Sequence, residues 1–168
     1  HSLGMELIVT DHHACPAEVP AALAVVNPRQ ADCPYPFKEL AGVGVVFKLL
    51  CAMEILRQPD RTALENIRCI SDGYMDLVAM GTVADVMPLQ DENRLIVSRG
   101  LHMMETSPRT SIAALLDATN TDAKPYQKRK ITSGYIGYTI APRINAAGRI
   151  RSASIAVELL LTKDRGQA

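Results

Sequence analysis

A short apolar segment near the start of the chain constrains the fold more than any other feature. Residues 5–10, MELIVT, have the composition of a buried β-strand, and they run directly into the polar triplet Asp11, His12 and His13. A buried parallel strand needs neighbours in the same sheet, and such neighbours are joined by crossover connections that are usually helical. We therefore expect an α/β fold that contains at least part of a parallel sheet.

The rest of the sequence offers only one obvious companion strand. Residues 22–28, ALAVVNP, have the composition of a second buried strand, which ends at Asn27 and Pro28. Helical periodicity predicts a helix over residues 41–58, ended by Pro59. Two strands are too little sheet to stand alone, so we expect part of a parallel-sheet domain with a largely helical remainder. The further helices are predicted over residues 72–80, 91–106, 111–119 and 152–162, with Ser111 and either Ser152 or Ser154 as N-caps.

Composition limits the class of protein. The 168 residues include 48% hydrophobic residues but no tryptophan, so the core must be aliphatic. The four cysteines form no C-x-x-C pair, which favours reduced thiols in a cytoplasmic protein. The longest apolar stretch is interrupted by Lys48 and Glu54 and is shorter than the ~20 residues that span a bilayer. We expect no membrane partner.

Charge is unevenly distributed along the chain, although the net charge is zero. Residues 1–120 hold nine Lys and Arg against fifteen Asp and Glu, whereas residues 121–168 hold nine against three. A basic segment after an acidic one suits a substrate that carries phosphates. A basic helical surface that is simply solvated would give the same pattern.

The triplet after the first strand has the residue types of a metal site. In open α/β sheets, functional groups gather at the carboxyl ends of the strands, which is where Asp11, His12 and His13 would lie. Imidazole nitrogen and carboxylate oxygen suit Mn²⁺ and similar ions. Two adjacent histidines taken alone are more often structural.

Asp85 is a second candidate ligand. It lies in DLVAMGTVADVMPL, residues 76–89, among small and apolar residues where a solvated charge is not expected. A buried carboxylate in such surroundings needs a cation or a set of hydrogen bonds. The alternatives are a helix cap and a charge exposed at an unpredicted turn.

An arginine-rich segment, TIAPRINAAGRIRSAS, covers residues 139–154. Arg143, Arg149 and Arg151 flank small residues that would let a ligand approach the backbone, and the guanidinium group matches phosphate oxygens. The segment therefore suits phosphate binding, although arginine-rich loops are usually solvated.

Four segments in this order resemble the DHH phosphoesterase superfamily, and within it the bacterial single-strand exonucleases of the RecJ family. They are VTDHH, NPRQADCPYPFKELAGVGVVFKL, GTVADVMPLQDENR and PRINAAGR. The DHH and GTVAD segments resemble the third and fourth motifs of the superfamily. The CPYPFKELAGVG and PRINAAGR segments resemble RecJ rather than its smaller relatives, and the resemblance covers nearly the whole chain.

The resemblance implies a 5′ to 3′ exonuclease that hydrolyses single-stranded DNA in recombination and repair, at a two-metal site for Mn²⁺ or Mg²⁺. It implies that His12 and Asp85 are metal ligands that meet at the carboxyl edge of the sheet, and that His13 lies near the scissile phosphate. Asp11 would orient the histidines, and Arg143 or Arg149 would hold the DNA phosphate. A single-stranded-DNA-binding protein is a further partner that the resemblance suggests.

The chain departs from the superfamily pattern because the first two motifs, which supply aspartates upstream of DHH, are not in this sequence. The metal site is therefore expected to be incomplete, the chain to be a piece of a longer protein, and the piece to be inactive alone. Residues 1–110 would be the C-terminal half of the DHH catalytic domain, and residues 111–168 a helical connector towards a DHHA1 domain. Two alternatives stay open, namely a small DHH phosphodiesterase for oligoribonucleotides or cyclic dinucleotides, and a non-catalytic DHH scaffold.

Overall fold

The computed structural model describes residues 3–119, 130–150 and 152–168, and for residues 149 and 150 it describes the backbone only. The chain divides into two compact units. We call His1–Tyr74 together with Met87–Leu95 the first unit, and Met75–Val86 together with Ile96–Ala168 the second unit. Each unit is described by itself.

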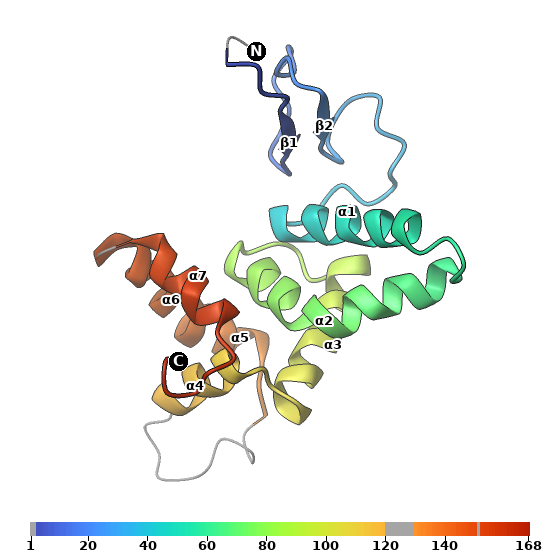
Figure 1. The fold of residues 1–168 in the computed structure, drawn as a ribbon. Coiled ribbons are helices and arrows are strands. Elements are labelled where there is room, and N and C mark those ends of the chain that lie inside the picture. Colours follow the sequence, from blue (N-terminus) through green and yellow to red (C-terminus); the bar gives the residue numbers. More distant parts are fainter. Residues whose placement is uncertain (1–2, 120–129, 151) are drawn as a thin grey trace. The chain divides into compact units, whose positions relative to one another are not determined.

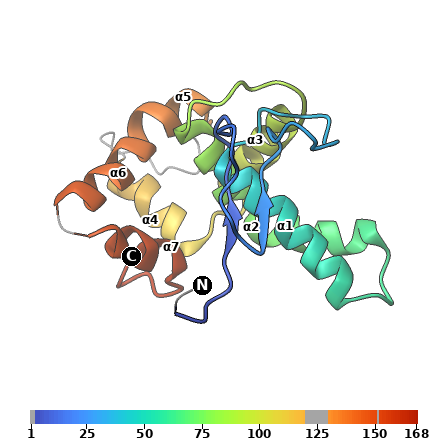
Figure 2. The same cartoon turned by 90° about the horizontal axis from the view of Figure 1, so that it is seen from above.

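The first unit contains a parallel pair of strands. Strand β1 is Ile8–Thr10 and strand β2 is Ala24–Val26, with Ile8 opposite Ala24 and Thr10 opposite Val26 (Figures 1 and 2). Both predicted strands and their parallel pairing are confirmed. Both strands are shorter than predicted. At the two ends of the pairing, the segments are joined by hydrogen bonds from Leu23 N to Leu7 O (2.8 Å) and from Asp11 N to Val26 O (3.1 Å).

The two strands have the composition of buried strands, but the described residues leave them uncovered. Residues of β1 and β2 are exposed or half-buried, and the side chain of Ile8 is 57% exposed. No further strand of the described residues lies beside them. The predicted fold class is nevertheless confirmed, because the described residues form a small parallel sheet with a largely helical remainder.

Helix α1, Gly42–Arg57, supplies much of the core of the first unit. Its bounds agree with the prediction, because Pro59 prevents the helix from continuing past Gln58. It follows the buried Leu40 and buries Val45, Phe47 and Cys51. The helix is adjacent to β1, and it begins close to the carboxyl end of that strand (Figure 1).

Helix α2, Ala63–Ala84, is much longer than the predicted helix over residues 72–80. Its start is a capping box. Thr62 Oγ1 accepts a hydrogen bond from Glu65 N (3.3 Å), and the Glu65 carboxylate accepts one from Thr62 N (2.8 Å). This T-x-x-E signal is visible in the sequence and should have extended the prediction. Helix α3, Asp91–Thr106, has the predicted bounds.

The remaining helices belong to the second unit. The PRINAAGR segment lies in helix α6. Ser152 caps α7 as predicted, through a hydrogen bond from Ser154 N (3.2 Å). Ser111 is not an N-cap, because Arg109 holds that position and the Ser111 side chain is fully buried. The elements are α4 (Thr110–Ala118), α5 (Ser133–Tyr135), the π-helical segment η2 (Ile136–Ile140), α6 (Ala141–Ile150) and α7 (Ala153–Leu161).

A buried ion pair connects two helices of the second unit. Arg109, just before α4, donates from Nε and Nη2 to the two carboxylate oxygens of Asp76 on α2, each at 2.6 Å. Asp76 is almost fully buried, so its charge depends on this planar, two-point partner. Within the described residues, no helix is both long and apolar enough to cross a membrane.

Close packing between α2 and α3 in the second unit requires a glycine. A Cβ atom on Gly100 would lie 2.2 Å from the Ala79 Cβ and 2.6 Å from the Met75 carbonyl oxygen. Both distances are shorter than any van der Waals contact, and the backbone oxygen cannot move without shifting α2. Gly100 therefore allows the two helices to approach each other.

We predict that Gly100→Ala destabilises the protein by about 1–3 kcal/mol or more, because the added methyl group overpacks this contact. Gly73→Ala is the matched control, since Gly73 also lies inside a helix and a Cβ there meets nothing within 4 Å. The control should stabilise α2 by up to ~1 kcal/mol. Thermal or urea unfolding measures both effects, and equal stability of the two variants would contradict the prediction.

Candidate metal centre

The DHH triplet lies at the carboxyl end of β1. Because β1 and β2 are parallel, their carboxyl ends meet at one edge of the sheet, and the hydrogen bond from Asp11 N to Val26 O (3.1 Å) holds the triplet at that edge. This is the edge at which open α/β sheets place functional groups.

The Asp11 carboxylate organises the triplet. Its Oδ1 accepts hydrogen bonds from His12 N (2.7 Å), His13 N (3.2 Å) and His13 Nδ1 (2.8 Å). The side-chain hydrogen bond from His13, followed by the two backbone hydrogen bonds, lowers the pKa of Asp11 to about 2. Asp11 is therefore ionised at neutral pH and can only accept.

The ionised Asp11 determines which nitrogen of His13 carries the proton. An acceptor at 2.8 Å from Nδ1 requires Nδ1 to be the donor. In the neutral imidazole, Nε2 is then unprotonated. Its lone pair can bind a metal ion or accept a proton. The His12 and His13 rings lie side by side, with centroids 4.3 Å apart.

The three side chains form a plausible part of a metal site. One ligand atom from each of Asp11, His12 and His13 can be chosen so that all three lie within 4.8 Å of one another, and no other such trio occurs among the described residues. Imidazole nitrogen and carboxylate oxygen are donors that suit Mn²⁺. Three donors are fewer than an octahedral ion needs, so the residues fit an incomplete site.

Two residues that the sequence analysis did not single out contact the triplet. A Cβ on Gly42, the first residue of α1, would lie 3.4 Å from Cδ2 of His12, which places the ring beside the start of the helix. Asn27 is buried and donates from Nδ2 to the His13 carbonyl oxygen at 2.9 Å. Gly42 begins the sequence GVG and Asn27 begins the sequence NP. Neither short pattern shows that the residue contacts His12 or His13.

Asp85 lies in the turn that follows α2. Its backbone N–H donates to Gly81 O (3.0 Å), and its side chain is exposed. The expectation of a carboxylate buried among apolar residues is therefore wrong, because the helix ends at Ala84 and the chain turns towards solvent. His12 belongs to the first unit and Asp85 to the second, so their meeting at one metal stays a prediction.

The predicted phosphate-binding arginines lie on or beside α6. Arg143 is exposed, and its Nη1 donates to Thr139 O at 2.6 Å in the preceding turn. The side chain of Arg149, like the whole of Arg151, lies outside the described residues. Arg143 is therefore available to solvent on a helix rather than on a loop.

The segment after Asp85 is anchored in the first unit. Glu92 accepts a hydrogen bond from Tyr35 Oη (2.5 Å) and pairs with Lys48 Nζ (2.5 Å). Asn93 is fully buried and donates to Glu39 O (2.6 Å) and Pro88 O (3.0 Å). These contacts, which we call the brace, join the CPYPFKELAG and MPLQDENR segments.

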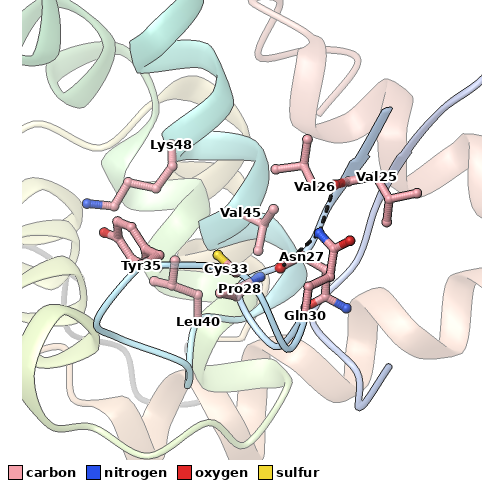
Figure 3. A pocket seen from close by; sticks show the side chains of 10 residues that line it. All are labelled: Val25, Val26, Asn27, Pro28, Gln30, Cys33, Tyr35, Leu40, Val45 and Lys48. Atoms are coloured by element: carbon pink, nitrogen blue, oxygen red, sulfur yellow. Dashed lines mark hydrogen bonds between the residues drawn. The ribbon is translucent and has the colours of Figure 1, made fainter. Parts of the chain in front are cut away.

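A mainly apolar pocket of about 290 Å³ lies between β2, the following loop and α1 (Figure 3). Val26, Leu40 and Val45 line it, with Lys48 and Tyr35 at one end and Asn27 at another part of its wall. Asn27 therefore faces both this pocket and the backbone of the DHH triplet.

Comparison with known proteins agrees with this site. Residues 1–82 match the DHH family, N-terminal domain. The chain is 40% identical over 166 residues to the single-stranded-DNA-specific exonuclease RecJ of Bacillus subtilis and 42% identical over 170 residues to that of Escherichia coli. Both alignments cover 99% of this chain but only 19% and 29% of those relatives.

Solved structures give the same result. A crystal structure of exonuclease RecJ bound to manganese matches with a TM-score of 0.75 and 36% identity, over 98% of this chain and 38% of that one. RecJ from Thermus thermophilus in complex with Mn²⁺ matches with a TM-score of 0.75 and 35% identity, over 99% of this chain and 22% of that one. The chain thus spans less than two fifths of these proteins.

The DHH triplet at the sheet edge, the family match and the similarity along nearly the whole chain lead to one conclusion: residues 1–82 match the DHH family, and the chain as a whole is similar to part of the RecJ exonucleases.

Proposed function

We propose that this chain is part of a metal-dependent exonuclease that hydrolyses single-stranded DNA from the 5′ end, in DNA recombination and repair. The observation that carries the proposal is the Asp11, His12 and His13 cluster at the carboxyl edge of the parallel strands. Relatives named single-stranded-DNA-specific exonuclease, and RecJ structures that hold manganese, support it.

In this proposal the residues of the chain have distinct roles. His12 and Asp85 bind Mn²⁺ or Mg²⁺, and the ion supplies an activated water and positive charge for the leaving oxygen. Asp11 holds His13 with its Nε2 lone pair free to accept a proton or contact the scissile phosphate. Residues 1–110 would be the later part of the catalytic domain, and residues 111–168 the connector towards a DHHA1 domain. The protein would act in the cytoplasm, with single-stranded-DNA-binding protein as a partner.

The brace disfavours the alternative of a small DHH phosphodiesterase. Tyr35 and Glu39 come from CPYPFKELAGVG, which resembles RecJ rather than its smaller relatives, and they bind Glu92 and Asn93 of a segment far along the sequence. Direct hydrogen bonds join the two segments, so the segment that resembles RecJ is an integral part of the first unit. This supports the exonuclease over a small DHH phosphodiesterase. The presence of both histidines likewise disfavours a non-catalytic scaffold.

We predict that the 168-residue chain binds Mn²⁺ only weakly, because it offers His12, Asp85 and at most His13 as ligands, and water must fill the other positions around the ion. Paramagnetic broadening of imidazole signals by added Mn²⁺ measures this, and His12 and His13 should broaden first. We call the Mn²⁺ concentration that gives half of the maximal broadening the half-effect concentration. His12→Ala should raise it about tenfold, the usual scale for losing a group that supports a metal site.

His102→Ala is the control for this experiment, since His102 is an exposed histidine on α3 outside the triplet. It should leave the half-effect concentration unchanged. Broadening of His102 at the same Mn²⁺ concentration as His12 and His13 would show that the ion binds exposed imidazoles without preference and would contradict the assignment.

We predict that the chain alone degrades no single-stranded DNA, whereas a full-length protein containing it does so with Mn²⁺ and loses that activity with Asp85→Ala. The physical reason is charge, since a two-metal site needs several carboxylates around ions ~4 Å apart. Release of nucleotides from single-stranded DNA measures activity, and Asp60→Asn, at an exposed acid outside the site, is the control. Robust hydrolysis by the isolated chain that His12→Ala abolishes would contradict this account.

We further predict that residues 121–168 contribute to DNA binding through phosphate contacts. Arg143 is exposed there, so Arg143→Gln should weaken binding and reduce the slope of log K against log salt by about 1. Fluorescence anisotropy with labelled single-stranded DNA at several salt concentrations measures the slope. Arg94→Gln, at an exposed arginine on α3, is the control, and an equal effect of both variants would indicate unspecific charge attraction.

A further inference from the structure

Asn27 is a buried polar residue that begins the NPRQADCPYPFKELAGVGVVFKL segment, and the family resemblance assigns it no role. It follows β2 directly, and its side chain is 4% exposed. We propose that Asn27 is a positioning residue of the metal centre, which holds the backbone of the DHH triplet in the conformation that presents both imidazoles. The metal part of this proposal rests on the function proposed above.

The orientation of the Asn27 amide is determined by its partners. Nδ2 lies 2.9 Å from the carbonyl oxygen of His13, which can only accept a hydrogen bond. Oδ1 lies 2.9 Å from the backbone N–H of Arg29, which can only donate. Both ends of the amide are therefore matched, and a flipped amide would face two repulsive contacts.

Asn27 completes a pair of ties that bracket His12. The first tie is the hydrogen bond from Asp11 N to Val26 O at 3.1 Å. The second is the hydrogen bond from Asn27 to His13 O. Since consecutive residues of β2 and its end hold the backbone on both sides of His12, the triplet cannot turn away from the strand edge without breaking one of them.

Asn27 is itself held in place by the turn that follows β2. Gln30 Nε2 donates to Val25 O at 2.9 Å and lies 3.4 Å from Asn27 O, which holds the turn after β2 against the strand (Figure 3). Pro28 is buried in the same turn and restricts the backbone of the residue before it. The position of the Asn27 side chain therefore fixes the position of the His13 carbonyl group.

Other side chains cannot perform this role. Aspartate has the same shape but no donor, and its carboxylate would face the His13 carbonyl oxygen. Serine is too short to reach both partners. Alanine would leave the His13 carbonyl and the Arg29 N–H without the partners they have here. Asparagine combines a donor and an acceptor at the required spacing.

The test compares Asn27→Asp with Asn66→Asp in the 168-residue chain. Asn66 is the matched control, because it is fully buried in the same unit and its Nδ2 also donates to a backbone carbonyl, that of Gln58 (3.1 Å). ¹⁵N relaxation measures the order parameters of the His12 and His13 amides, and Mn²⁺ broadening of their imidazole signals measures metal binding. Asn27→Ala, which adds no charge, replaces Asn27→Asp if that variant does not fold.

We expect Asn27→Asp to lower both amide order parameters from about 0.85 to below about 0.6 and to raise the half-effect Mn²⁺ concentration about tenfold, while Asn66→Asp changes neither. Unchanged order parameters in Asn27→Asp and Asn27→Ala, or an equal loss in Asn66→Asp, would overturn the proposal. If Mn²⁺ fails to broaden the histidines of the unmodified chain, the proposed function fails, whereas the order parameters still decide the role of Asn27.

Discussion

The candidate centre depends on one interaction, the acceptance of three hydrogen bonds by a single oxygen of Asp11. These bonds turn the chain sharply after β1 and assign the proton of His13 to Nδ1. They also lower the pKa of Asp11 to about 2, so the carboxylate stabilises the folded turn at pH values above its ordinary value of 3.8. The contribution is lost only as the pH falls towards about 2. Around neutral pH, the Asp11 carboxylate therefore stays ionised.

The brace performs the corresponding task for the segment that follows Asp85. Residues 87–95 belong to the first unit although the residues on both sides belong to the second. Glu92 is held by Tyr35 and Lys48, and Asn93 by two backbone carbonyls. Burial and the hydrogen bond to Glu92 raise the pKa of Tyr35, and although burial alone would lower the pKa of Lys48, its contacts with Glu92 and Tyr35 raise it overall. Both groups thus keep their protons, and the brace persists, across the neutral range.

Local patterns in the sequence predicted what local forces determine. Helices α1 and α3, the cap at Ser152 and the parallel strands follow from periodicity, proline positions and capping residues. Helix α2 is longer than predicted, because it begins at the capping box of Thr62 and Glu65, and α6 has no helix of its own in the prediction. The DHH triplet was found because adjacent residues form it, and the exposure of Asp85 was mispredicted because it depends on where α2 ends. Asn27 and Gly42 escaped notice since their partners are distant in sequence or made by backbone atoms, which no residue pattern displays.

The segment between α2 and α3 combines an unfavourable local conformation with contacts to residues that are distant in sequence. Val86 has φ 57 and Asp91 has φ 44, so two residues other than glycine with left-handed backbones enclose the segment between α2 and α3. A β-branched residue in this region costs on the order of 1–3 kcal/mol, and the exposed Val86 side chain gains little burial in return. Inside the first unit, the Asn93 amide holds this segment by donating to Pro88 O within it and to Glu39 O outside it. A buried asparagine thus holds the segment after Met87 within the first unit, just as a buried asparagine after β2 holds the DHH triplet.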